Sequence, residues 1–410
     1  MADYLFINQY ASTPVEGFGG RYYYFSKVLQ EHGEKVLLVT SSNHHLLRQK
    51  PVFNGLWHFS NYDGLDVLWL KTLPYTRANS PIRVINWFLF ALYMPFLRLL
   101  KARPKQIHFS SPSPIPFLGV CLLSKLFKSK TVFDVRDVWP ETLIEIGGIS
   151  RRNLFVRFLG WVESFSYRNA DVVTSNLANL EVRFNELGLN VDNFLWISNG
   201  VDIKGVEFSL TNSNIKLPIQ CNNKKVIGYT GTLGEANSII TLLQVARLFI
   251  DKPEYVFLIV GSGKEQSSLI SYCEDNNITN VIFMDAVTKA DVYKVQSMMD
   301  VLCVGAKPSP LYRYGVSPNK LYEYIYSGVP VLYYIDTVGY HPVRDAGCGE
   351  QVTSSDLQEF YRAIIKLTSL STEEYSLMKK NAQKYIIENH LYDNLALKLV
   401  DKVDKYVKSV

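Results

Sequence analysis

The chain has 410 residues, more than a single hydrophobic core usually organises, so we expect two domains. Hydrophobic residues make up 47% and charged residues 20%, which excludes a disordered protein and is typical of a globular one. The five cysteines show neither the spacing of a zinc site nor the density of a disulfide framework, which favours a reducing compartment. The N-terminus lacks the features of a secretory signal, so we expect a cytoplasmic protein that begins near Met1.

Short β-branched and aromatic runs alternate with longer helical patterns, as a parallel sheet with crossover helices requires. In the first half we predict strands at residues 3–10, 34–41, 65–72, 106–111, 130–137, 170–176 and 194–200. In the second half we predict strands at residues 224–231, 255–263, 281–286, 300–306 and 329–335. The pattern predicts the α/β class, with two doubly wound Rossmann-like domains.

The domain boundaries follow from where this alternation stops. We expect one domain at residues 1–202 and another at 224–390, joined by a polar linker at 203–223 that has little helical periodicity. Residues 391–410 are predicted to form a helix that packs back on the first domain.

The net charge of +5 is unevenly distributed. No acidic residue lies between Asp66 and Asp134, whereas ten basic residues do: Lys71, Arg77, Arg83, Arg98, Lys101, Arg103, Lys105, Lys125, Lys128 and Lys130. This region contains an apolar run of about 14 residues, shorter than the roughly 20 that span a bilayer, so we do not expect a spanning helix.

The apolar run at 84–97 has two interpretations. It is either a core helix or a surface that dips aromatic side chains into a lipid interface while basic residues meet anionic headgroups. The side chains expected at that interface are Trp87, Phe88, Phe90, Tyr93 and Phe96. Nucleic acid is not expected as a partner, because the aromatic residues do not alternate with the charges.

Ligands of doubly wound sheets bind beyond the carboxyl ends of the strands, so the segments that follow strands carry the most information. After the first strand, Gly19 and Gly20 permit close backbone approach before a helix, and Arg21 favours an anion there; the alternative is a flexible turn. In the second half, "GYTGTLG" and "IVGSGKE" place glycines directly after strands, which suggests phosphate contacts through backbone amides or simply tight turns.

The strand at 130–137 runs into a cluster of polar and aromatic residues. These are Asp134, Arg136, Asp137, Trp139 and Glu141. An aspartate here is often only a helix cap, and an arginine only an ion-pair partner. So many ionisable groups at one strand end nevertheless indicate a site for polar substrates.

The stretch "YGVSPNKLYEYIYSGVP" predicts a helix that Ser317 caps, that Pro318 starts and that Gly328 ends. Lys320 falls in the first turn, where the helix dipole disfavours a cation unless an anion is also bound. Glu323, about 4.5 Å further along the axis, could accept hydrogen bonds from sugar hydroxyls. The alternative is that Lys320 pairs with a carboxylate elsewhere and that Glu323 is solvated.

These motifs, in this order, resemble glycosyltransferase family 4, the retaining nucleotide-sugar transferases of GT-B fold, and in particular the bacterial surface-polysaccharide branch. The resemblance covers most of the chain, from "GGRYYYFSKVLQEHGEKVLLVTS" through "FDVRDVWPE" and "ISNGVD" to "SPNKLYEYIYSGVPVL". It implies two domains that face each other across a cleft, a nucleotide-sugar donor that we expect to be UDP-linked, a lipid-linked saccharide acceptor, and no metal or other cofactor.

The resemblance also implies roles for individual residues. The catalytic candidates are Asp137, Arg136 and Glu323, with Glu323 on the ribose. The donor-binding candidates are Gly19, Gly20, Gly231, Thr232, Lys307, Arg313, Ser317, Lys320 and Glu323. The acceptor-binding candidates are Arg21, Trp139 and Glu141.

Two positions depart from the family pattern. Gly315 stands where many members carry a further glutamate, eight positions before Glu323. The basic pair that many members have after the "GYTGTLG" strand is also missing, and Lys307, Arg313 or Lys320 could replace it. The sequence therefore predicts a retaining glycosyltransferase, which could be peripheral on the cytoplasmic membrane. A nucleotide-sugar epimerase of the same fold and a catalytically silent binding protein remain as alternatives.

Overall fold

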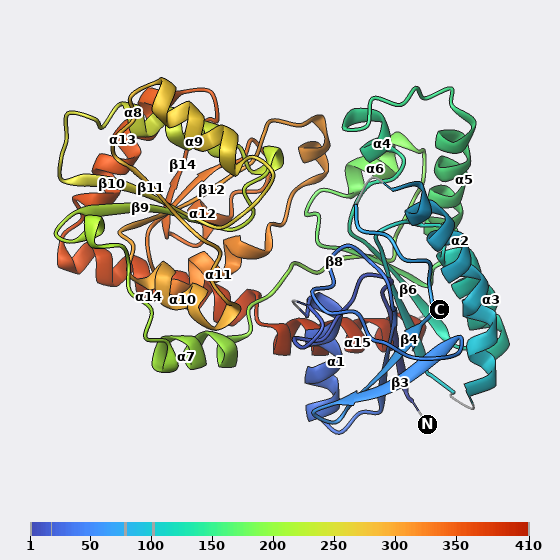
Figure 1. The fold of residues 1–410 in the computed structure, drawn as a ribbon. Coiled ribbons are helices and arrows are strands. Elements are labelled where there is room, and N and C mark those ends of the chain that lie inside the picture. The colour runs from blue at the N-terminus through green and yellow to red at the C-terminus, as the bar shows by residue number, and fades with distance from the viewer. Residues whose placement is uncertain (1, 18, 78–79, 101–102, 409–410) are drawn as a thin grey trace. The chain divides into compact units, whose positions relative to one another are not determined.

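The structure is a computed structural model that describes residues 2–17, 19–77, 80–100 and 103–408. The chain forms two compact units. Unit 1 contains Met1–Asn199, Arg313–Val316 and Tyr392–Val410, and unit 2 contains Gly200–Tyr312 and Ser317–Leu391. Each unit is an α/β domain with its own sheet and its own core (Figure 1).

Unit 1 is built on an eight-stranded sheet in the order β3-β4-β2-β1-β5-β6-β7-β8, in which only β3 is antiparallel to its neighbour. Its strands are β1 (Tyr4–Ile7), β2 (Val36–Ser41), β3 (Trp57–Tyr62), β4 (Leu65–Leu70), β5 (Gln106–Ser111), β6 (Lys130–Val135), β7 (Val172–Ser175) and β8 (Phe194–Trp196). Its helices are α1 (Arg21–Glu31), α2 (Pro81–Phe96), the 3₁₀ helix η1 (Leu97–Leu100), α3 (Phe117–Phe127), α4 (Glu141–Glu145), α5 (Leu154–Asn169), α6 (Glu181–Glu186) and α15 (Tyr392–Lys408).

Unit 2 is built on a six-stranded parallel sheet in the order β11-β10-β9-β12-β13-β14. Its strands are β9 (Lys225–Thr230), β10 (Tyr255–Val260), β11 (Val281–Met284), β12 (Val301–Gly305), β13 (Val331–Tyr334) and β14 (Gly349–Gln351). Its helices are α7 (Ile203–Asn212), η2 (Ile219–Cys221), η3 (Glu235–Asn237), α8 (Ile239–Arg247), α9 (Gln266–Asp275), α10 (Lys289–Ser297), α11 (Asn319–Ser327), α12 (Pro342–Asp345), α13 (Leu357–Thr368) and α14 (Thr372–Asn389). The 3₁₀ helix η4 (Pro310–Tyr314) straddles the boundary between the units.

Both sheets reverse their winding direction at one point. In unit 1 the chain runs from β1 outward to β4 and then returns to β5, so the switch point lies between β1 and β5. In unit 2 it runs from β9 out to β11 and returns at β12, which puts the switch point between β9 and β12. Ligands of such sheets bind at the carboxyl ends of the strands beside the switch point.

Every strand that the sequence predicts is present, but two strands and one helix differ from expectation. The hairpin strand β3 and the short edge strand β14 were not predicted, because neither shows a continuous apolar run. Residues 203–223, expected to be a linker, contain helix α7, which packs in unit 2. Helix α15 lies in unit 1, where Tyr392 stacks on Tyr24 at 4.6 Å between ring centroids.

The apolar run of the first half belongs to a longer helical segment than the sequence suggested, and it has both a buried and an exposed apolar side. Helix α2 and η1 together span the 20 residues Pro81–Leu100. By length and composition this segment could cross a membrane, although 33% of its most apolar stretch is buried in the protein. Trp87 and Phe90, expected at a lipid interface, are instead buried in unit 1. Phe88 and Phe96 are exposed as that interpretation requires.

Candidate functional site

Several residues that the motifs of the second half predicted as ligand-binding lie at the carboxyl ends of β9 and β12 in unit 2. Gly231 follows β9, and Lys307 lies two residues beyond the end of β12. Helix α11, the next element after η4, contributes Lys320 and Glu323. The motifs that sequence analysis singled out in the second half therefore meet at the switch point of the unit 2 sheet.

Helix α11 begins one residue later than predicted. Pro318, not Ser317, occupies the N-cap position, and no side chain caps the first turn. Ser317 is buried, and its hydroxyl is hydrogen-bonded to the hydroxyl of Tyr322 at 3.1 Å. Gly328 ends the helix in the left-handed conformation, as predicted. Because no side chain caps α11, the amides at its start can bind an anion, although that of Leu321 already donates to the carbonyl oxygen of Pro318 at 3.1 Å.

Lys320 lies in the first turn of α11 and reaches the end of β9. Its Nζ donates a hydrogen bond to the Tyr229 hydroxyl at 2.6 Å and lies 4.0 Å from the centroid of the Tyr229 ring. A weaker hydrogen bond at 3.4 Å runs to Oδ1 of Asn237. Burial lowers the pKa of Lys320 to about 7, and Glu323 opposes this shift. The ammonium group is therefore poorly compensated in the ligand-free protein and would be stabilised by an anion.

Gly231 makes this position of Lys320 possible. Its φ of +144° lies in the region that favours glycine, and a Cβ there would come within 2.7 Å of Lys320 Nζ and 3.1 Å of the Tyr229 hydroxyl. The glycine after β9 thus leaves space for the ammonium group, while its own N–H donates a hydrogen bond to the carbonyl oxygen of Val260 at 2.9 Å.

Glu323 is on the same helix one turn after Lys320. Its Oε1 accepts a hydrogen bond from the Tyr293 hydroxyl at 2.9 Å, and burial raises its pKa while Lys289, Tyr293 and Lys320 oppose the rise. The carboxylate is partly accessible. An acceptor group held in this way can receive hydrogen bonds from hydroxyl groups of a ligand.

The remaining predicted donor residues of unit 2 lie close to this group. Lys307 forms an ion pair with Glu235 on η3, and both side chains are exposed. The carbonyl oxygen of Thr232 accepts hydrogen bonds from the Tyr229 hydroxyl at 2.9 Å and from Nδ2 of Asn237 at 3.0 Å. Lys307 is therefore a weaker candidate than Lys320 for phosphate compensation, because a carboxylate already neutralises it.

In unit 1, Asp137 and Arg136 follow strand β6, as predicted. Burial raises the pKa of Asp137, and Arg136 and Arg83 oppose the rise. The Asp137 side chain is nevertheless exposed, so we expect a smaller rise than for an enclosed carboxyl group. Arg83 comes from α2 and donates a hydrogen bond to the Tyr10 hydroxyl at 2.8 Å. The structure thus adds Arg83 to the polar groups around Asp137.

The predicted acceptor residues Arg21 and Trp139 are enclosed by the protein. Arg21 is 5% exposed, and its guanidinium donates hydrogen bonds to the carbonyl oxygens of Ile197 and Ser198 and to Asp134 Oδ1, the last at 3.2 Å. Trp139 is buried against Trp87 with 5.3 Å between ring centroids. These contacts indicate that both residues support the fold, and neither presents its polar group to solvent.

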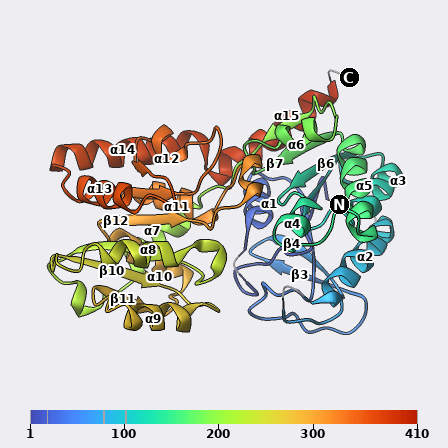
Figure 2. The ribbon, with the colours of Figure 1, turned by 90° about the horizontal axis from the view of Figure 1, so that it is seen from above.

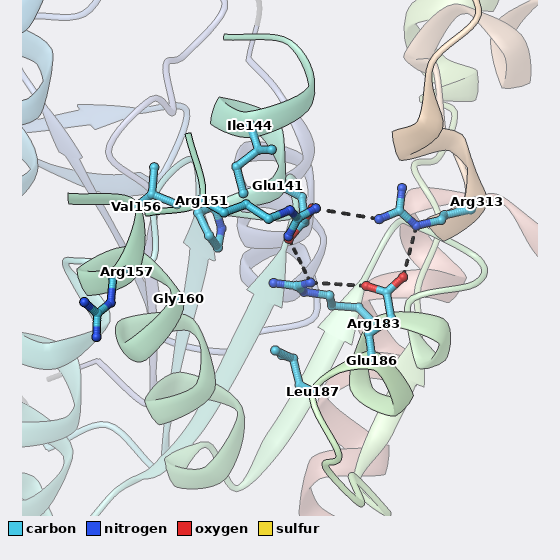
Figure 3. Close-up of a pocket in the computed structure, with 11 residues that line it drawn as sticks. Glu141, Ile144, Arg151, Val156, Arg157, Gly160, Arg183, Glu186, Leu187 and Arg313 are labelled. Carbon is cyan, nitrogen blue, oxygen red and sulfur yellow. Dashed lines mark hydrogen bonds and ion pairs between the residues drawn. The ribbon is translucent and has the colours of Figure 1, made fainter. Parts of the chain in front are cut away.

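Glu141, the third acceptor candidate, lines a pocket of about 490 Å³ in unit 1. Its carboxylate accepts two hydrogen bonds from Arg151, at 2.9 and 2.7 Å, and one from Arg183 at 3.1 Å. Figure 3 shows the side chains of Glu141, Arg183, Glu186 and Arg313 pointing toward one another, whereas Arg157 points away. Glu141 therefore belongs to a compensated network of alternating charges.

Arg313, a donor-binding candidate, belongs to the same network. Its Nε donates a hydrogen bond to Glu186 Oε1 at 3.0 Å, and its Nη2 lies 3.8 Å from Glu141 Oε2. The hydroxyl of Tyr314 donates to the other oxygen of Glu186 at 2.6 Å. The segment Arg313–Val316 is thus part of unit 1 although the residues before and after it belong to unit 2.

The same segment explains why position 315 is a glycine. Gly315 has a φ of +94°, and a Cβ there would lie 2.6 Å from the backbone nitrogen of Ala178. The carbonyl oxygen of the preceding Tyr314 accepts a hydrogen bond from the backbone N–H of Asn179 at 3.0 Å. A glutamate cannot occupy this position without displacing the backbone at residues 177–179.

We expect Gly315→Ala to lower the free energy of unfolding of unit 1 by about 1–3 kcal/mol, because it combines left-handed strain with a backbone clash. All six tryptophans of the chain lie within residues 57–196, so tryptophan fluorescence during urea unfolding reports on unit 1. Gly33→Ala is the matched control, since Gly33 has a φ of +84° but a Cβ added there would meet no atom within 4 Å. Equal losses for the two variants would contradict the close approach.

Comparison with known proteins agrees with these observations. Residues 216–385 match the family model "Glycosyl transferases group 1". The chain is 21% identical over 266 residues to the putative colanic acid biosynthesis glycosyl transferase WcaI of Escherichia coli K12. That alignment covers 62% of this chain and 64% of WcaI, so the chain spans just under two thirds of the length of this relative.

Solved structures match over nearly the whole chain. Sucrose-phosphate synthase of Thermosynechococcus elongatus is 14% identical with a TM-score of 0.76, and the alignment covers 100% of both chains. HepE of Anabaena, solved in complex with UDP-glucose, is 15% identical with a TM-score of 0.65, and the alignment covers 99% of both chains.

The two sheets and the similarity to solved structures show that the chain has the GT-B fold. Its second unit is similar to the glycosyl transferases of group 1, whose family model matches residues 216–385. The resemblance that the motifs indicated is thereby confirmed.

Proposed function

We propose that this protein transfers a sugar from a nucleoside diphosphate donor to a hydroxyl group of a lipid-linked saccharide during surface polysaccharide biosynthesis. The observation that carries the proposal is the pairing of Lys320 with the uncapped start of α11, at the switch point of unit 2. The match of residues 216–385 to the group 1 family model supports the reaction class, and the name of WcaI supports the pathway class. UDP is the proposed nucleotide, because HepE was solved with UDP-glucose.

The diphosphate would bind at the N-terminus of α11, with Lys320 as its counter-charge. When the bond between the sugar and the diphosphate breaks, negative charge develops on the leaving phosphate, and preorganised donors at this point stabilise that charge. Gly231 supports this contact, because a side chain at that position would collide with Lys320 Nζ. Glu323 would accept hydrogen bonds from the ribose hydroxyls on the same side of the helix.

The proposed stereochemical course is retention without a bound metal. Two carboxylates about 5 Å apart, the arrangement of retaining hydrolases, are not part of the predicted site, and the family resemblance implies that the leaving phosphate deprotonates the acceptor. Asp137 and Arg136 would then position the acceptor hydroxyl, with Arg83 holding the Asp137 charge. Adding EDTA should leave transfer unchanged if no metal takes part.

We expect donor binding to weaken as pH rises above 7. Burial lowers the pKa of Lys320 to about 7 in the free protein, so the lysine is mostly neutral at pH 8 and must take up a proton to pair with the diphosphate. A nucleotide sugar has no terminal phosphate that titrates in this range, and its affinity should fall by about tenfold per pH unit between pH 7 and 9. Calorimetry in buffers of different ionisation enthalpy measures both the affinity and the proton uptake.

Lys320→Met is the control for this pH dependence. The variant should bind weakly at every pH and should take up no proton. A wild-type affinity that does not change between pH 7 and 9 would contradict the proposed contact between Lys320 and the diphosphate.

The reaction class is tested by incubating the protein with nucleotide sugars, with and without lipid-linked saccharides extracted from a polysaccharide-producing bacterium. A new glycosidic bond of the same anomeric configuration as the donor is the expected result. Formation of an epimeric nucleotide sugar without acceptor would instead establish the epimerase alternative. If neither product forms although the donor binds, the protein is a binding partner and the proposal is wrong.

A further inference from the structure

Helix α2 and the following η1 present two opposite apolar stripes. The inner stripe contains Trp87, Phe90, Met94 and Leu97, with the polar Asn86 beside them, all buried in unit 1. The outer stripe contains Ile85, Phe88, Leu92, Phe96 and Leu99, which are 41–69% exposed. At about 100° per residue the centres of the two stripes lie about 180° apart on the helix surface. A core helix of a globular domain normally has polar residues on its outer face, so the outer stripe needs a separate explanation.

The apolar surface continues onto the neighbouring helices. Figures 1 and 2 show α2, α3 and α5 together on one flank of unit 1. Gly119 of α3 lets the helices approach closely, since a Cβ there would lie 2.1 Å from the carbonyl oxygen of Ala91. On α5, Phe158 stacks on Phe88 of α2 at 6.0 Å and Trp161 is 56% exposed. We call this surface, formed by the exposed apolar residues of α2, η1, α3 and α5, the α2–α3–α5 face.

The charge along the α2, η1 and α3 part of this face is of one sign. Exposed basic residues border it at Arg98, Arg103, Lys125 and Lys128, and the segment between Asp66 and Asp134 contains no acidic residue. The guanidinium of Arg98 lies over the ring of Phe127 at 5.4 Å, so charge and apolar surface are directly adjacent. Lys101 lies outside the described residues. An apolar surface with a basic border matches the interface of an anionic bilayer, where apolar side chains enter the acyl boundary and cations meet the headgroups.

The contacts of Asn86 argue against the alternative that α2 crosses the bilayer. Its side chain exchanges hydrogen bonds with the backbone of Leu73, 2.9 Å to the N–H and 2.8 Å to the carbonyl oxygen. Its own carbonyl oxygen accepts a hydrogen bond from Gln9 Nε2 at 3.1 Å. Extracting α2 from unit 1 would break these bonds and leave the backbone of residue 73 without its partner.

We propose that the α2–α3–α5 face binds the surface of an anionic lipid bilayer and that it lies on one leaflet without spanning it. This inference does not depend on the proposed reaction, because it follows from exposure and charge in unit 1 alone. It resolves the two interpretations of residues 84–97: the inner stripe is core, and the outer stripe faces lipid.

Flotation of the full-length protein with vesicles tests the proposal. We expect binding to vesicles of phosphatidylcholine with phosphatidylglycerol, weaker binding to phosphatidylcholine alone, and a decrease with salt. The variant Leu92→Ser/Phe96→Ser/Leu99→Ser should bind at least about tenfold less protein. Its matched control, Val52→Ser/Ile219→Ser/Leu377→Ser, removes three residues that are 60–96% exposed elsewhere and should bind like the wild type.

A charge variant and three further measurements keep the test decisive. Lys125→Glu/Lys128→Glu changes only exposed residues and should lose the preference for anionic vesicles while its melting temperature stays that of the wild type.

Equal loss in both triple variants, or no flotation of the wild type at low salt, would overturn the proposal. Resistance of bound protein to alkaline carbonate would overturn it in favour of a spanning helix. A dimer in sedimentation that the first triple variant abolishes would overturn it in favour of a second copy that covers the face. Transfer of sugar to a soluble acceptor should be unaffected by these substitutions. This result separates the membrane proposal from the proposed function.

Discussion

Lys320→Met should reduce kcat/KM for sugar transfer by about 10²–10³, the usual cost of removing one group that stabilises charge on a leaving oxygen. Methionine keeps most of the length of the apolar stem but removes the ammonium group, which lies over the Tyr229 ring. Because burial lowers the pKa of Lys320, the charge is unfavourable in the free protein, and we expect the melting temperature to stay the same or to rise. Steady-state kinetics and thermal unfolding measure the two effects.

Lys307→Met is the matched control for this variant. Lys307 is exposed and paired with Glu235, so its loss should change kcat/KM by less than about tenfold. A loss of stability in Lys320→Met that matches its loss of activity would show a structural lysine. Equal activity losses for the two variants would contradict the assignment of the diphosphate to α11.

Arg21→Met should lower the free energy of unfolding of unit 1 by about 3–5 kcal/mol, because it leaves the buried carboxylate of Asp134 without its partner. The side chains of Arg21 and Asp134 are 2% and 1% exposed, and their closest atoms are 3.2 Å apart. Asp134 Oδ1 also accepts a hydrogen bond from Thr174 at 2.9 Å, which compensates only part of the charge. Urea unfolding followed by tryptophan fluorescence measures the loss.

The double variant Arg21→Met/Asp134→Leu separates the pair from the packing around it. Removing both charges should recover most of the lost stability, because replacing a buried ion pair by apolar groups is often neutral. If Arg21 instead contacts a ligand, the single variant should keep its stability and lose activity, and the structural assignment would be wrong.

The sequence predicted the elements whose local pattern and tertiary role agree. The parallel strands other than β14 are largely continuous apolar runs, so all twelve were predicted, and the glycine that ends α11 has the left-handed conformation that its residue type suggests. The group formed by Gly231, Lys320 and Glu323 was also predictable, because each residue follows a strand or lies near the start of a helix next to the switch point.

What the sequence did not predict depends on contacts between segments that are distant along the chain. Arg21 looks like an anion ligand after a glycine turn, but its partner Asp134 is more than a hundred residues away. Arg313 looks like a phosphate ligand until the fold brings it to Glu186. Tyr229 lies within "GYTGTLG" and Tyr293 lies in a helix, but neither residue type indicates that it holds Lys320 or Glu323.

Gly315 is another residue whose role depends on a contact with a distant segment of the chain. Its departure from the family pattern suggests a lost ligand when only the sequence is considered. In the structure it is a consequence of the segment Arg313–Val316 packing against residues 177–179 of unit 1. A missing side chain can therefore record a close backbone approach as well as a lost function.

A crystal structure of the protein soaked with a UDP-sugar tests the central claim most directly. We predict phosphate oxygens within hydrogen-bond distance of Lys320 Nζ and of the first amides of α11, with the ribose hydroxyls at the Glu323 carboxylate. A nucleotide bound elsewhere, with Lys320 still on the Tyr229 hydroxyl and no phosphate beside it, would contradict the claim.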